Sequence, residues 1–145
     1  MTDSCPPGHP KGYDHYDAVS YTPYAQNIPR ARRHVARLAV DWGQPRAAGD
    51  AALLASELCT NALLHGCLRD RLFRVETSLT VHALRIAVTD PRGERLPDSS
   101  PFDPDAKFGR GLLIVHVLAD RWGLERLTVG KTVWAELDLP RSLNA

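Results

Sequence analysis

Apolar side chains recur along the chain at two spacings, and these spacings outline its secondary structure. In residues 29–42, and again from about residue 45 or 50 to residue 65, apolar residues recur every three or four positions. This spacing predicts two α-helices, each with a buried face. In residues 73–79 and 84–90 apolar and polar residues alternate, which predicts two half-buried strands.

The N-terminal part of the chain differs in composition from the rest. Residues 1–17 are rich in Pro, Gly, His and Asp and hold almost no aliphatic side chains. We therefore expect a flexible tail there and a single domain over residues 18–145. Residues 18–24 predict a short strand, and Pro23 places it at an edge or an end of a sheet because proline cannot donate a ladder hydrogen bond.

The C-terminal third contains a long aperiodic stretch followed by three further elements. Residues 91–108 hold four prolines and show no periodicity, which is typical of a functional or disordered loop. The pattern then predicts a helix over residues 112–119. Two closing strands follow at 122–129 and 132–139, and we expect them to meet at a turn that contains residues 130–131.

The order of these elements groups helices and strands instead of alternating them. This order favours an α+β fold, a two-layer α/β sandwich in which helices cover one face of a mostly antiparallel, mixed sheet. With 145 residues, of which 43% are hydrophobic, the chain is long and apolar enough to form one core.

The overall charge excludes several function classes. The formal net charge is +1, so no strong field draws the chain directly to nucleic acid or to a membrane surface.

No apolar run approaches the ~18–20 residues of a membrane span, and the first residues do not have the order of a secretory signal. Three cysteines cannot all pair with one another, which is consistent with a reducing compartment. We expect a cytoplasmic protein.

Three polar side chains share one stripe of the second predicted helix. Glu57, Asn61 and His65 are four residues apart and therefore face the same way. Polar groups on a buried helix need partners, and a hydrogen-bond network within the protein would provide them. The alternative is a site in which Asn61 offers its amide oxygen to Mg²⁺ and Glu57 deprotonates or orients a nucleophile.

Two further motifs flank the proline-rich loop. Asp90 ends a predicted strand, and Gly93 follows it. The carboxylate could accept a hydrogen bond from an exocyclic amine while the backbone at the glycine approaches a flat base. The alternative is an ordinary turn at the end of the strand, where Asp, Pro and Gly are the usual residues. Gly109 and Gly111 directly precede a helix, where backbone N–H groups can converge on phosphate.

Two cations lie beside these glycines. Lys107 and Arg110 could neutralise phosphate charge, or they could be solvated loop cations.

Taken in order, these motifs resemble those of the gyrase, histidine-kinase and heat-shock-chaperone ATPase superfamily, whose nucleotide fold is named after Bergerat. The segment 57–65 is similar to its N-box, 90–93 to its first glycine box and 109–112 to its second. The resemblance covers roughly residues 20–140 and implies a histidine-kinase-like ATPase domain that binds ATP and Mg²⁺. It also places His65, Leu112 and Thr132 in the cofactor-binding set.

The compact single-domain form resembles bacterial anti-sigma factor kinases, which are serine/threonine kinases that control sigma factors. This resemblance implies that Asn61 is a Mg²⁺ ligand, that Glu57 is the base for the attacking hydroxyl, and that Asp90 binds the adenine amine. Residues 94–108 would form an ATP lid. The implied partners are a sigma factor and an anti-anti-sigma antagonist protein, and a homodimer is suggested by the same likeness.

The first glycine box departs from the pattern of the family. The usual motif is Asp-x-Gly-x-Gly, but Arg92 and Glu94 leave only Gly93. An arginine has far more bulk than glycine and restricts the backbone. The departure keeps open an alternative function, an ATP-dependent protein-binding module without kinase activity.

Overall fold

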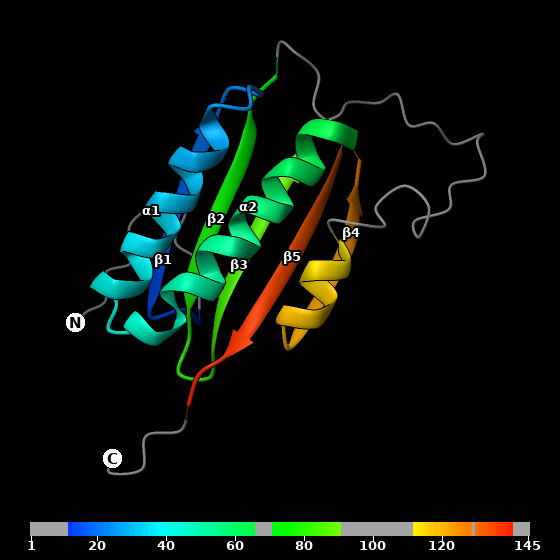
Figure 1. Cartoon of the computed structure of the whole chain (residues 1–145). Coiled ribbons are helices and arrows are strands. Elements are labelled where there is room, and N and C mark those ends of the chain that lie inside the picture. The colour runs from blue at the N-terminus through cyan, green and yellow to red at the C-terminus, as the bar shows by residue number, and fades with distance from the viewer. Residues whose placement is uncertain (1–11, 66–70, 91–111, 129, 141–145) are drawn as a thin grey trace.

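Five strands form one sheet in the computed structural model, which describes residues 12–65, 71–90, 112–128 and 130–140. The strand order is β1-β2-β3-β5-β4, and each of the four pairings is antiparallel, so these five strands contain no parallel pair of the kind that a mixed sheet implies. The expected α+β sandwich is confirmed (Figure 1). The strands are β1 (His15–Tyr21), β2 (Phe73–Leu79), β3 (Ala83–Asp90), β4 (Arg121–Leu127) and β5 (Gly130–Asp138).

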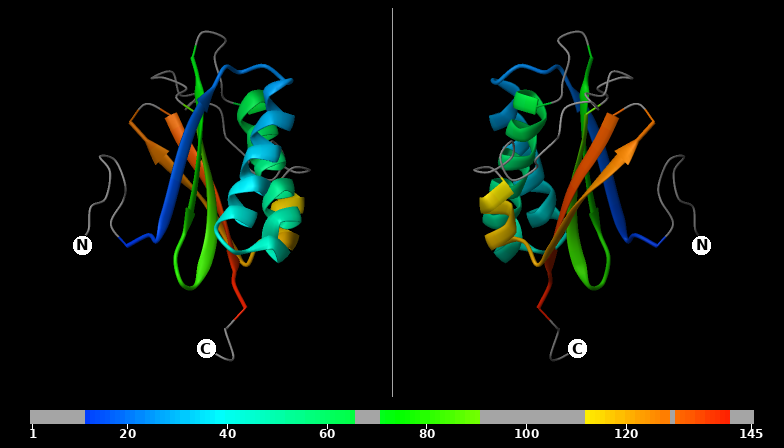
Figure 2. Two further views of the ribbon diagram at one scale, coloured as in Figure 1. Left: turned by 90° about the vertical axis from the view of Figure 1, so that its left-hand side faces the viewer. Right: turned by 90° about the vertical axis from the view of Figure 1, so that its right-hand side faces the viewer.

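Helices cover one face of this sheet, and Figure 2 shows them together on that side in both views. Within the described ranges they are α1 (Asn27–Asp41), α2 (Ala48–His65) and a short helix at residues 112–118. A 3-10 turn, η1 (Pro45–Ala47), joins α1 to α2. None of the helices in the described part of the chain combines the length and apolar character that a membrane crossing requires.

The first strand begins three residues earlier than the sequence predicts. The backbone N–H of Asp14 donates a 2.8 Å hydrogen bond to the carbonyl of Leu79, and the His15 ring stacks on Trp42 with 5.1 Å between centroids. Residues 15–17, which we expected in the tail, are therefore the start of β1. The strand ends at Tyr21, three residues before its predicted end, because Pro23 cannot donate a ladder hydrogen bond, and it lies at the edge of the sheet, as predicted.

The final hairpin turns earlier than predicted. Gly130 and Lys131 are paired residues of β5, opposite Leu127 and Arg126, so the connection lies before them. Gly130 has φ of 136°, a backbone conformation that side chains rarely tolerate, and this explains a glycine at the start of the strand.

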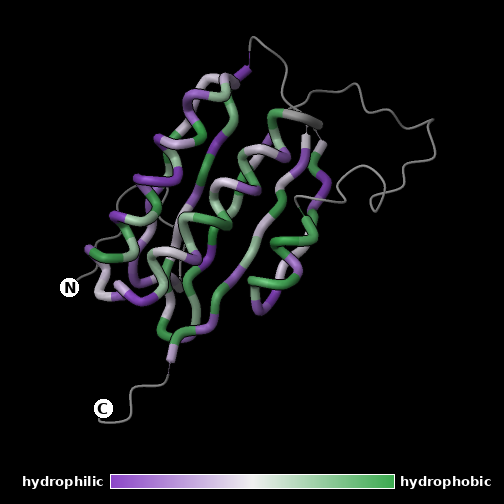
Figure 3. Tube along the Cα trace, in the orientation of Figure 1, coloured by the Kyte–Doolittle hydropathy of each residue, from purple (hydrophilic) through white to green (hydrophobic). Residues whose placement is uncertain are grey.

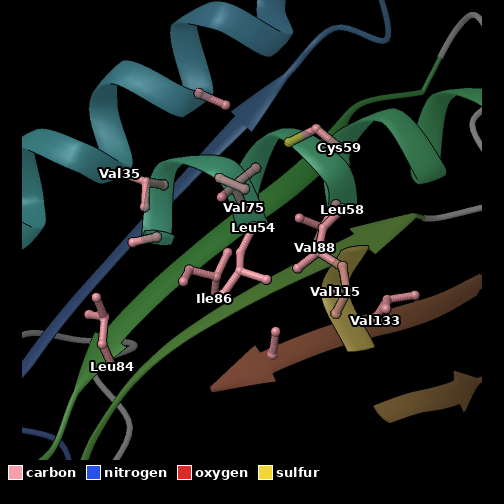
Figure 4. Close-up of a cluster of buried hydrophobic side chains, with 14 of the residues drawn as sticks. Val35, Leu54, Leu58, Cys59, Val75, Leu84, Ile86, Val88, Val115 and Val133 are labelled. Atoms are coloured by element: carbon pink, nitrogen blue, oxygen red, sulfur yellow. The ribbon is translucent and has the colours of Figure 1, made fainter. Parts of the chain in front are cut away.

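The core lies between the sheet and the two long helices. Helix α1 turns Ala31, Val35 and Ala39 inward, and hydrophilic and hydrophobic residues alternate along it in Figure 3. From α2, Leu54 and Leu58 meet side chains of the central strands, as Figure 4 shows. Burial of one such aliphatic side chain contributes about 1.5–3 kcal/mol.

The other face of the sheet carries polar and aromatic side chains. Trp134 of β5 lies directly opposite Gly123 of β4, and the Arg85 guanidinium lies 4.6 Å from the centroid of the Trp134 ring. Arg85 also forms a 3.2 Å ion pair with Glu136. A β-carbon at Gly123 would lie 2.9 Å from a ring carbon of Trp134, so only glycine leaves room for the ring there.

Candidate functional site

An apolar platform underlies the predicted site. Leu58 of α2, Val88 of β3, Val115 of the helix at 112–118 and Val133 of β5 are all buried, and Figure 4 shows them gathered under the second half of α2. These residues come from four separate elements. The platform therefore fixes those elements relative to one another.

At one end of this platform the inward-facing positions change from apolar to polar on three elements at once. On α2 the change occurs one turn beyond Leu58, at Asn61. On the strands it occurs two residues beyond the valines, at Asp90 of β3 and at Lys131 of β5. The side chains are 4%, 1% and 9% exposed respectively. Three polar groups buried at one end of a sandwich are typical of a binding site, because their desolvation needs compensation.

Asn61 has an unsatisfied oxygen at this position. Its Oδ1 atom is buried and accepts no hydrogen bond from the parts of the chain that the structure describes. An unpaired buried acceptor costs about 1–3 kcal/mol. An amide oxygen is a hard ligand of the kind that Mg²⁺ accepts alongside phosphate oxygens. The residue therefore fits a role in holding Mg²⁺.

Glu57 lies one helical turn before Asn61 on the same stripe of α2, and it is half-buried. Within the described ranges no cation lies within ion-pair distance of its carboxylate. The α2 stripe thus places a half-buried carboxylate one turn from the unpaired amide oxygen of Asn61.

Asp90 and Lys131 are directly opposed residues of β3 and β5, and both face the helix layer. Directly opposed residues of antiparallel strands hold their β-carbons about 4.5–5.5 Å apart. Arg126 of β4 is the next residue in the same row. Three ionisable side chains therefore cross the end of the sheet on the side that α2 covers.

Thr132, by contrast, lies on the other face. Its hydroxyl is 2.8 Å from the hydroxyl of Thr89, its directly opposed residue. The structure does not bring Thr132 together with Asp90 and Asn61, and its part in cofactor binding stays a prediction. Lys131 takes the inward position instead. Counting back by twos from the buried Leu137, Ala135 and Val133 reaches 131, so the alternation in the sequence carried this signal.

The remaining predicted residues divide between described and undescribed parts. Leu112 is half-buried and packs against the core at the start of its helix. The side chain of His65 lies outside the described residues. So do the predicted lid and the residues that we expected to contact base and phosphate in the glycine boxes, namely Gly93, Lys107, Gly109, Arg110 and Gly111.

Comparison with known families agrees with this geometry. Residues 22–137 match the model of the histidine kinase-like ATPase domain, which is well over half of the chain. The chain belongs to the histidine kinase-like ATPase family. Among curated proteins, none matches it. Membership of the family implies ATP binding, and the buried polar end formed by Asn61, Asp90 and Lys131 lies within the matched region.

Proposed function

We propose that this ATP-binding protein is an anti-sigma factor with serine/threonine kinase activity toward an antagonist protein. The observation that carries the proposal is the polar stripe of α2. It places the half-buried Glu57 one turn from Asn61, whose Oδ1 is buried with no partner in the described residues. A hydrogen-bond network within the protein would leave no such orphan.

The site chemistry that we propose follows from these side chains. Asn61 holds Mg²⁺ through Oδ1, and Asp90 accepts a hydrogen bond from the adenine amine. Mg²⁺ supplies neutralisation of phosphate charge when it is bound. Glu57 removes the proton from the hydroxyl group of the protein acceptor. Phosphoryl transfer requires mainly positioning and charge stabilisation, so these few groups suffice.

A basic groove on α1 supports the proposed protein partner. A groove of about 220 Å³ is lined by Arg30, Arg33, His34 and Arg37. His34 is held by Asp17 at 2.8 Å, whereas the three arginines make no ion pair with a carboxylate of the described residues. On a chain of net charge +1 this groove concentrates positive charge. We propose that it receives an acidic segment of the sigma factor or of its antagonist.

The test begins with a pull-down from lysate with and without Mg-ATP, read by mass spectrometry, to supply the acceptor. Radiolabelled phosphate transfer to that acceptor is then compared for wild type and Glu57→Gln. Glutamine keeps the size of the side chain but cannot take up a proton near neutral pH. We expect transfer to slow by about 10²–10⁴-fold with ATP affinity little changed. Transfer at the wild-type rate would refute the role of Glu57.

One sequence feature favours the second candidate function, an ATP-dependent protein-binding module. Arg92 and Glu94 stand where the first glycine box usually has its two glycines, and both lie outside the described residues. If wild-type protein captures a partner only with ATP but transfers no phosphate to it, this second function replaces the kinase.

A further inference from the structure

One face of the sheet is turned away from the helices (Figure 2), and a groove of about 220 Å³ lies on it. Three small side chains line this groove, those of Ser78 in β2, Ala87 in β3 and Thr132 in β5. In the strand register they form a diagonal across three neighbouring strands, each two residues further along than the one before. All three are buried between larger side chains, so they form the floor of a hollow, which we call the open-face groove.

The hollow exists because the large side chains beside it point elsewhere. Ala87 lies directly opposite Trp134, but the Trp134 ring lies over Gly123 on the next strand, where a β-carbon would come within 2.9 Å of the ring. The Arg85 guanidinium is also directed to that ring, at 4.6 Å from its centroid. The space above Ala87 therefore stays open.

Ser78 carries an unused hydrogen-bonding group at one end of the open-face groove. The residue is only 5% exposed, and its hydroxyl forms no hydrogen bond with the described residues. A polar side chain buried to this degree normally has a partner. Glu76 lies two residues before Ser78 on the same face of β2 and also lines the groove. This end therefore offers a hydroxyl oxygen and a carboxylate to a hydrogen-bond donor.

Glu125 of β4 supplies a negative charge at the other end of the groove. In the described part of the chain no cation lies within ion-pair distance of its carboxylate. The other charges that line the groove are already matched. Arg74 lies 3.5 Å from Glu76. Arg85 lies 3.2 Å from Glu136. The unmatched carboxylate of Glu125 makes the open-face groove electrostatically complementary to a cation.

We propose that the open-face groove binds a linear alkyl diamine, with one ammonium group at Glu125 and the other at Ser78 and Glu76. Three strand steps and four residues separate Ser78 from Glu125, which places their α-carbons roughly 20 Å apart across the diagonal. The side chains at both ends reach inward and shorten this span. A diamine with an octane-length chain therefore fits the distance between the two groups of acceptors.

The lining suits both parts of such a ligand. Its methylene groups lie over the methyl group of Ala87, and its ammonium groups donate the hydrogen bonds that carboxylates and a serine oxygen accept. The rings of Tyr13 and Tyr16 line the Ser78 end, and the face of an aromatic ring attracts a cation. The open-face groove lies across the sheet from Asn61, so this inference does not rest on ATP binding.

The test is a titration of isotope-labelled protein without nucleotide, followed through the backbone amide chemical shifts. Diaminooctane, diaminobutane and aminooctanol are compared. We expect saturable shifts at Ser78, Ala87 and Thr132 with diaminooctane. Diaminobutane is too short to reach both ends, and aminooctanol has one ammonium group. Each should bind about 2–5-fold more weakly, which is the contribution of one exposed ion pair.

Four variants locate the site. Glu125→Gln should weaken diaminooctane by about 2–5-fold, and Ser78→Ala by about 2–10-fold because a buried hydrogen bond is lost. Ala87→Leu fills the floor of the groove and should abolish binding. Asp41→Asn is the matched control, since it removes an exposed carboxylate at the end of α1 in the helix layer, and it should change nothing.

Equal affinities of the three amines for wild type would overturn the inference, and so would unchanged binding by Glu125→Gln. Shifts that spread over the surface without saturating would also overturn it, because they would show general attraction of cations without a site. The wild-type titrations need no variant, so they decide the matter even if Ala87→Leu fails to fold. None of these outcomes bears on the proposed function.

Discussion

Replacement of Asn61 by leucine should make the protein more stable and remove most of the contribution of Mg²⁺ to ATP binding. Asn61 is almost fully buried, and its Oδ1 accepts no hydrogen bond from the described residues. Leucine has nearly the same shape and no polar atom. Residues that a protein retains at a cost in stability are typical of functional sites.

The size of the effect follows from that single oxygen. Relief of an unpaired buried acceptor contributes about 1–3 kcal/mol, and leucine adds roughly half a kcal/mol or less through its higher helix propensity. For a chain of this length, 1 kcal/mol shifts the melting temperature by about 2–4 °C. We therefore expect Asn61→Leu to melt roughly 2–12 °C above wild type without ligand.

The assay is thermal denaturation with and without ATP and Mg²⁺. With Mg-ATP at a hundred times its Kd, wild type should gain about 2.7 kcal/mol in free energy of unfolding. We expect Asn61→Leu to lose most of this gain in Mg²⁺. ATP without Mg²⁺ should shift both proteins by similar amounts, because the role that we propose for the lost oxygen is to hold the metal.

Thr77→Val provides the matched control. The Thr77 hydroxyl is also buried in the core and also lacks a partner among the residues that the structure describes. Its removal should stabilise the protein and leave the ATP-induced shift unchanged. If Asn61→Leu instead lowers the melting temperature without ligand, Asn61 is a structural residue. A full Mg-ATP shift in that variant would show that Asn61 does not hold the metal.

Two further predictions concern stability. Gly123→Ala should destabilise the protein by about 1–3 kcal/mol, because its β-carbon would lie 2.9 Å from the Trp134 ring; an unchanged thermal midpoint would contradict this. A hydrogen bond from Arg121 holds the pKa of Asp138 below its ordinary value. The ionised carboxylate therefore stabilises the fold at pH values above the pKa that Asp138 has in the unfolded chain, and this stabilisation is lost as the pH falls through the lower pKa of the folded protein. Thermal midpoints of Asp138→Asn should therefore fall less than those of wild type as the pH drops below about 4, and added salt should reduce the difference; parallel midpoint–pH curves would refute it.

The sequence predicted the elements well wherever side-chain periodicity was strong. The two long helices and the central strands lie within a few residues of their expected bounds. The first strand was placed late because His15 and Tyr16 are held by long-range contacts. His15 stacks on Trp42 and Tyr16 bonds to Glu76, and no local pattern reveals such partners.

The site was predicted less completely, because the face of the sheet on which a side chain lies depends on where the strand begins. Asn61 and Asp90 were identified from spacing and order, and the structure buries both at the same end of the sandwich. Lys131 was missed because the turn was placed on it, which hid its alternation with Val133. Thr132 was chosen from the resemblance, and its hydroxyl bonds to Thr89 on the opposite face.

The β3–β5 pairing has a consequence for the order in which the protein folds. β2 with β3, and β4 with β5, are hairpins between neighbours in sequence, so each can form with a short loop closure. The pairing of β3 with β5 joins the two hairpins across some forty residues, and such non-local pairing forms slowly. Asp90 belongs to one hairpin and Lys131 to the other. The buried polar end of the sandwich is therefore complete only after the hairpins have joined, and nucleotide binding in a refolding experiment would time that event.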